Sequence, residues 1–192
     1  MLALVAGLVV FLGVHSIGIL APRWRNARVM QMGERRWKGV FSLVSIAGFV
    51  LLVWGYGRSP SDPVALWTPP AWAPHATALL AVVAFILVVS AYVPGTHFRS
   101  ALGYPMTVGV GVWALGHLLS NATPRDVVLF GAFLVWSIAV FATRRRRDQA
   151  AGVAYAAGHV RQDVIAIVAG VVGALVFALF LHAPLIGVRP FG

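Results

Sequence analysis

The chain has 192 residues, of which 60% are hydrophobic and only 10% are charged. Water-soluble domains have roughly 45–50% apolar and about 25% charged residues, so this composition excludes an ordinary soluble domain and indicates one polytopic membrane domain over residues 1–192. The formal net charge of +10 is typical of a nucleic-acid-binding protein, but the positions of the charges along the chain argue against that function.

Six apolar stretches are long enough, or nearly so, to cross a membrane. A spanning helix needs about 20 mostly apolar residues, and it satisfies its backbone polar groups within the segment. We do not expect the first stretch to be a cleaved signal peptide, because its basic residues follow the apolar run instead of preceding it. We therefore predict an all-α fold, a bundle of six transmembrane helices. The predicted spans lie near residues 2–21, 39–56, 76–93, 106–122, 127–143 and 164–182.

The basic residues predict how this bundle is oriented. Twelve of the 15 Lys and Arg residues lie in the connections 22–38, 94–105 and 144–163, which fall on one side of the membrane if the helices alternate. The positive-inside rule places these connections in the cytoplasm of a bacterial inner membrane and both termini in the periplasm. The run Arg144–Arg147 then acts as a stop-transfer signal that contacts anionic membrane lipid, and no nucleic-acid partner is expected.

Small and acidic residues predict two local features of the helices. Ala3 and Gly7 are four residues apart, as are Gly170 and Ala174, and this spacing favours close helix packing. Asp126 lies at the start of a predicted helix, where a carboxylate caps free N–H groups. The same role is expected for Asp163.

Two histidines, His15 and His117, lie well inside predicted spans, where ionisable groups are functional candidates. Trp113 and Asn121 share a helix face with His117, and Asn121 could fix its tautomer by a hydrogen bond. The chain has no cysteine, so a metal must be held by histidine, carboxylate or methionine. Two imidazoles on facing helices can hold haem, with His15 and His117 as the metal ligands.

An alternative needs no cofactor, because each histidine could instead hydrogen-bond a backbone carbonyl or a serine. The predicted spans also place His15 about 5 Å to the cytoplasmic side of the midplane and His117 about 5 Å to the other side, given a rise of about 1.5 Å per residue. One haem would have to be tilted to reach both. Arg23, Trp24 and His97 are expected to rim the cytoplasmic entrance. No catalytic triad, phosphate-binding loop or dinucleotide motif is present in the sequence.

Several motifs, in the same order, resemble the NnrU family over about residues 1–140. They are HSIGILAPRWR (His15–Arg25), GERRWKGVFSLVSIAGFVLLVWGYG (Gly33–Gly57), LWTPPAW (Leu66–Trp72), AYVPGTHFRSAL (Ala91–Leu102), PMTVGVGVWALGHLLSN (Pro105–Asn121) and VLFG (Val128–Gly131).

The resemblance implies a bacterial integral membrane protein associated with denitrification, that is, with nitrite and nitric oxide reduction. The family is distantly similar to 15-cis-zeta-carotene isomerase, a membrane enzyme that uses haem b with histidine ligation. It therefore implies a haem b site whose histidines match His15 and His117. The expected function is an accessory or redox-linked factor that contacts membrane lipid and either a lipophilic substrate or respiratory and denitrification proteins.

Two alternatives stay open beside this function. The chain could be a haem-dependent cis–trans isomerase of a polyene such as zeta-carotene, or a cofactor-free structural or assembly subunit, so whether it is an enzyme is undecided. Ala114 stands where the isomerase would have a further cysteine, which speaks against ligand switching of that type. Gly103 and Tyr104 replace the Arg-His that often precedes Pro-Met in the family, which speaks against a methyltransferase.

Overall fold

The computed structural model describes residues 1–59, 64–188 and 190, and within these ranges it contains helices and no strand. In a lipid environment the backbone N–H and C=O groups of an apolar run can hydrogen-bond only to one another, which favours a helix. The elements are α1 (Leu2–Leu20), α2 (Pro22–Met32), α3 (Glu34–Arg58), α4 (Ala73–Ser90), α5 (His97–Leu102), α6 (Pro105–Ser120), α7 (Pro124–Ala150), α8 (Val160–Val176), the π-helical segment η1 (Phe177–Leu181) and α9 (His182–Ile186).

The predicted all-α polytopic fold is confirmed. The helices α1, α3, α4 and α7, and the continuous helical segment Val160–Ile186, are long and apolar enough to cross a membrane. The sixth apolar helix, α6, has 16 residues, and at about 1.5 Å per residue it is shorter than the roughly 30 Å of a hydrocarbon core. It matches the predicted span 106–122, which is rich in glycine (Gly109, Gly111 and Gly116).

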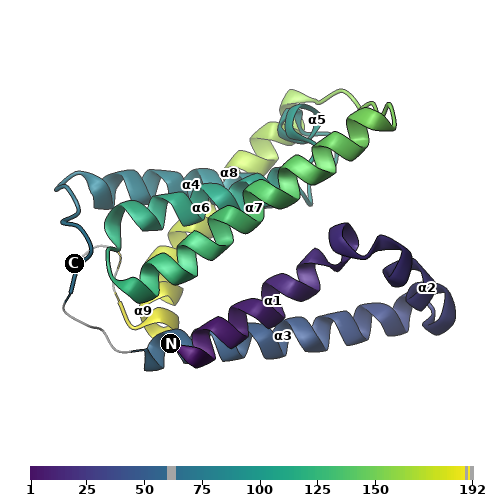
Figure 1. Cartoon of the computed structure of the whole chain (residues 1–192). Coiled ribbons are helices and arrows are strands. Elements are labelled where there is room, and N and C mark those ends of the chain that lie inside the picture. Colours follow the sequence, from purple (N-terminus) through teal and green to yellow (C-terminus); the bar gives the residue numbers. More distant parts are fainter. Residues whose placement is uncertain (60–63, 189, 191–192) are drawn as a thin grey trace.

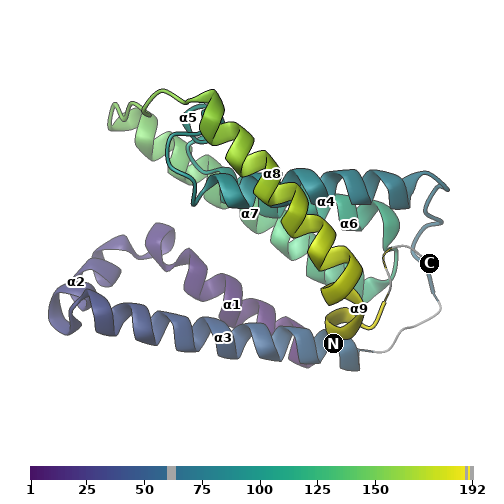
Figure 2. The same cartoon turned by 180° about the vertical axis from the view of Figure 1, so that it is seen from behind.

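Two groups of helices make up the bundle (Figures 1 and 2). The antiparallel pair α1 and α3, with α2 at the bend between them, forms one group, and α4, α6, α7 and α8 form the other. Contacts between α1 and α7 join the groups. In both views the N-terminus and α9 lie at one end of the bundle, whereas α2 and α5 lie at the other. We call this second end, to which Arg144–Arg147 also belongs, the basic end.

Small residues allow close helix packing, as the sequence predicts. A Cβ on Gly7 would collide with the backbone of Leu52, and one on Gly48 would lie 2.9 Å from the backbone nitrogen of Phe11. The glycines thus let the backbones of α1 and α3 touch, which a larger side chain would prevent. Gly170 makes a similarly close approach to Ile86 of α4.

The expectation that the connection 22–38 is a loop is wrong. This stretch contains α2 and the first turn of α3. Pro22 occupies the first turn of α2, where its fixed φ suits a helix. Gly33, at φ 82°, ends this helix before α3 begins at Glu34. A hydropathy pattern cannot detect α2, since a short polar helix carries no apolar signal of its own.

The ends of α7 and the start of α8 also differ from the prediction. The helix α7 continues through the arginine run to Ala150, beyond the predicted end at residue 143. Asp126 does cap it, in a capping box with Thr123. Asp163, predicted to cap α8, instead accepts hydrogen bonds from the backbone and ring of His97 in α5, at 2.8 and 2.6 Å. This carboxylate thus joins two helices across the basic end.

Candidate functional site

His15 lies on α1 where this helix, α3 and α7 meet. Its ring centroid is 4.4 Å from that of Phe11, 5.1 Å from Phe41 on α3 and 6.4 Å from Trp136 on α7. Its Nδ1 lies 2.7 Å from the carbonyl oxygen of Phe11, one turn earlier. A carbonyl only accepts, so Nδ1 holds the proton, and in the neutral ring Nε2 keeps a free lone pair.

His117 has the same arrangement on α6. Its Nδ1 lies 2.9 Å from the carbonyl oxygen of Trp113, and its ring packs 4.8 Å from that of Phe130 on α7. The sequence suggests that Asn121 fixes the tautomer of this imidazole, but Asn121 does not bond the ring. Its amide donates instead to the backbone carbonyl of His117 at 2.8 Å. The tautomer is therefore set by the carbonyl of Trp113, and Nε2 is again the nitrogen that could bind a metal.

The two imidazoles do not contact each other; other aromatic rings connect them. Phe11 stacks on His15 and lies 5.9 Å from Phe133 of α7, which in turn lies 5.5 Å from Trp113, the neighbour of His117. Phe133 is buried in the core cluster of α1, α3, α6 and α7. Phe11 and Trp113 pack against this cluster, so the rings that connect the two histidines belong to the core of the bundle.

The two histidines also differ in depth. Gly18, one turn from His15, lines the same cleft as Tyr104, which precedes α6. The rise of an α-helix is about 1.5 Å per residue. His15 precedes Gly18 by three residues and so lies roughly 5 Å from the level of the cleft, whereas His117 follows Tyr104 by thirteen residues and lies roughly 20 Å from it. Metal–imidazole bonds are about 2 Å long, so two nitrogens on one iron would stand about 4 Å apart. The two imidazoles differ too much in depth to bind one iron together.

None of the three residues expected at an entrance packs against the ring of His15 or His117. His97 begins α5, and its side chain, 55% exposed, pairs with Asp163. Arg23 is exposed on α2. Trp24 packs edge-on against Trp37 of α3, at 5.8 Å between the ring centroids.

Two hollows do lie close to His15. A polar cleft of about 420 Å³ lies at the basic end, between the end of α1, the start of α2 and the end of α7. An apolar groove of about 410 Å³ lies along α1 and α3. His15 itself lines neither hollow: Gly18 and Ile19, one turn later on the same face of α1, line the cleft, whereas the groove is lined by residues of another face of α1, among them Gly13 and Ile17.

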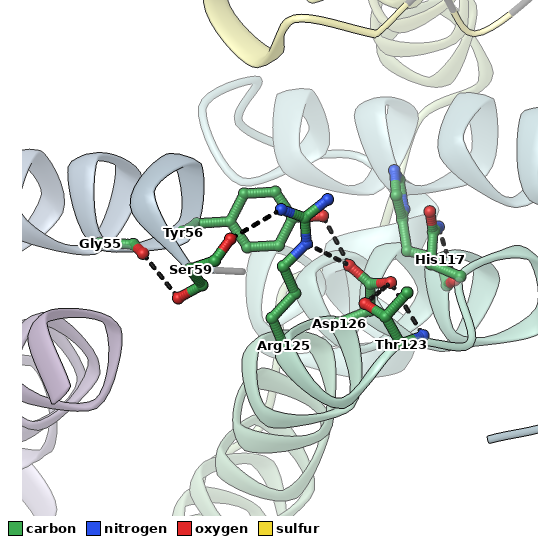
Figure 3. Close-up of polar contacts among 8 residues, drawn as sticks. Gly55, Tyr56, Ser59, His117, Thr123, Arg125 and Asp126 are labelled. Carbon is green, nitrogen blue, oxygen red and sulfur yellow. Dashed lines mark hydrogen bonds and ion pairs between the residues drawn. The ribbon is translucent and has the colours of Figure 1, made fainter. Parts of the chain in front are cut away.

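Two long-range polar contacts were not predicted from the sequence. The indole of Trp136 donates to the hydroxyl of Ser16 at 3.0 Å and so ties α7 to α1 beside His15. At the opposite end, the hydroxyl of Tyr56 donates to the carboxylate of Asp126 at 2.6 Å (Figure 3). No local pattern indicates either pair, because the partners are far apart in the chain.

Arg125 completes the polar cluster in Figure 3. Its guanidinium lies 4.9 Å from the centroid of the Tyr56 ring and donates to the carbonyl of Ser59 at 3.2 Å. The side chain of Asp126 is only 5% exposed, and it also accepts from the hydroxyl and backbone of Thr123 at 2.5 and 3.1 Å. The cluster thus fastens the end of α3 to the start of α7.

In a comparison with protein families, the chain matches the family model described as NnrU protein over residues 3–190. The match includes the last helices, beyond the residues 1–140 in which the sequence motifs are found. No curated protein and no solved structure matches the chain significantly.

Proposed function

We propose that this chain, which belongs to the NnrU family, is an accessory membrane factor of nitrite and nitric oxide metabolism that binds haem b through His15. Family membership supports the link to nitrogen oxides. The observation that supports the haem is the state of the imidazole, whose Nδ1–H is held by the carbonyl of Phe11 while Nε2 keeps its lone pair.

We favour His15 over His117 because of its surroundings. A haem group would need space beside the histidine that holds it, and Gly18 and Ile19, one turn after His15 on the same helix face, line the polar cleft. The neighbours of His117, Trp113 and Phe130, belong to or pack against the core cluster. With a single histidine ligand, haem would supply a one-electron couple and an open coordination position for a small ligand.

The protein's own contribution would be to hold and surround the ring of His15. The Phe11 carbonyl fixes the tautomer, and the rings of Phe41 and Trp136 keep the imidazole in an apolar setting. The hydrogen bond from Trp136 to Ser16 holds α7 against α1 at this level. The haem content of the purified protein, compared between the wild type, His15→Ala and His117→Ala, tests the assignment.

A second candidate is the cofactor-free structural subunit. The observation in its favour is that both histidines satisfy Nδ1 with a carbonyl of their own helix and pack against aromatic rings. In that case the imidazoles are packing residues, and the purified protein is colourless. A haem-dependent polyene isomerase would need the cofactor as well, so the same measurement bears on it.

For the orientation we propose that the basic end faces the cytoplasm of a bacterial inner membrane and that both termini face the periplasm. The distribution of Lys and Arg supports this. So does the position of the N-terminus and α9 at the end of the bundle opposite α2 and α5 (Figures 1 and 2).

A further inference from the structure

We propose that the polar cleft at the basic end binds a phosphate monoester group. The cleft, of about 420 Å³, is formed by the end of α1, the start of α2, the residue before α6 and the end of α7. It is lined by Gly18, Ile19, Pro22, Arg25, Asn26, Tyr104, Arg144, Arg147 and Asp148. This site goes beyond the proposed haem function, and its test needs no haem.

The charge of the lining favours an anion. Arg25, Arg144 and Arg147 oppose a single carboxylate, Asp148. Asp148 already accepts a hydrogen bond from the hydroxyl of Tyr155. Burial, followed by the hydrogen bond to Asp148, raises the pKa of Tyr104 to about 12, so this phenol stays neutral and adds no negative charge. The cleft thus has an excess of two positive charges, and a phosphate monoester carries about −1.5 to −2 at pH 7.

The arginines keep donors free for a ligand. Arg147 donates to the carbonyls of Gly18 and Ile19 at 3.3 and 2.7 Å, but a guanidinium has five N–H groups. Arg144 lies 5.1 Å over the ring of Tyr104, a stacking contact that fixes the guanidinium without using its donors. Arg25 donates to the side-chain oxygen of its neighbour Asn26 at 3.1 Å through one guanidinium nitrogen. Planar guanidinium groups bind phosphate through two parallel hydrogen bonds.

The first turn of α2 adds a second, independent attraction. Pro22 and Arg25 of this turn line the cleft. No side chain caps the start of the 11-residue helix, and its first turn holds no acidic residue. Free backbone N–H groups at a helix start, together with the positive end of its dipole, favour a phosphate. The opposing carbonyls at the end of α1 are partly neutralised by Arg147.

The arginine run contains both the residues to be tested and matched control residues. Of the four arginines at 144–147, only Arg144 and Arg147 line the cleft. Arg145 lies over the ring of Tyr155, and Arg146 is exposed. The double substitutions Arg144→Gln/Arg147→Gln and Arg145→Gln/Arg146→Gln remove the same charge from the same helical turn, so a general attraction to anionic lipid would respond equally to both.

The experiment uses the full chain, purified in detergent and delipidated. Inorganic phosphate and phosphatidic acid are titrated separately, with phosphatidylcholine as the lipid control, and the Kd is measured for each variant. We expect the Arg144/Arg147 variant to raise the Kd at least tenfold and the Arg145/Arg146 variant to change it less than twofold. If both ligands bind, the phosphate group suffices; phosphatidic acid alone identifies a lipid headgroup, and phosphate alone a soluble ligand.

Because Arg147 also caps α1, the first variant could fail to fold. The single change Arg25→Gln then tests the proposal, because Arg25 makes no contact that caps α1. Its control is Arg23→Gln, at an exposed position of the same helix. We expect Arg25→Gln to weaken binding at least threefold and Arg23→Gln to leave it unchanged. Binding of neither ligand by the wild type, or equal weakening by each variant and its control, would overturn the proposal.

Discussion

The hydroxyl of Tyr56, near the end of α3, donates a 2.6 Å hydrogen bond to the carboxylate of Asp126, in the first turn of α7. The two residues are 70 positions apart, and the carboxylate is almost fully buried. This contact, reinforced by Arg125, joins the α1–α3 pair to the other helix group at the end opposite the basic end.

The Tyr56→Phe variant is therefore expected to be less stable by about 1–3 kcal/mol, because a buried acceptor loses its donor while the ring stays in place. Thermal unfolding of the detergent-purified protein measures the effect. Tyr92→Phe is the control, since Tyr92 is 76% exposed. Equal unfolding temperatures for the two variants would show that the bond does not stabilise the fold.

The contact between α1 and α3 gives a second prediction. We expect Gly7→Ala to destabilise the protein by about 1–3 kcal/mol, because a methyl group there collides with the backbone of Leu52, which cannot move aside as a side chain could. Gly13→Ala on the same helix meets nothing within 4 Å and is expected to be neutral or stabilising. Similar unfolding temperatures for both variants would contradict the close approach.

The orientation can be tested with single cysteines, because the natural chain has none. Val64→Cys lies in the connection after α3, and Arg146→Cys lies at the basic end; both positions are exposed. In intact spheroplasts we expect a membrane-impermeant maleimide to label position 64 and to label position 146 only after permeabilisation. Labelling of position 146 in intact spheroplasts would reverse the proposed orientation.

The helical fold could be predicted from the sequence because each span carries its own signal. An apolar run long enough to cross a membrane must form a helix, whatever its neighbours are. The helix α2 has no such signal. The extension of α7 through Arg144–Arg147 is charged, so a hydropathy pattern does not detect it. Close packing at Gly7 and Gly170 could be predicted because small residues four apart share one helix face.

The candidate site could be predicted only in part. That His15 and His117 lie within spans follows from their positions in the chain, but whether they meet depends on the relative depth and rotation of α1 and α6. Phe133 of α7 lies among the rings that connect them, and no local pattern reveals a contribution from a third helix. The same limit applies to the cleft, which Arg25 of α2 and Arg147 of α7 line together with the end of α1.

The most direct test of the proposed function is the haem content of the detergent-purified protein, expressed with haem supplied and measured by its absorption spectrum. We predict a Soret band in the wild type, at least a tenfold loss of bound haem in His15→Ala, and less than a twofold change in His117→Ala. All three proteins must be monodisperse, so that loss of haem is not loss of fold. A folded but colourless wild type, or full retention of haem by His15→Ala, would contradict the account.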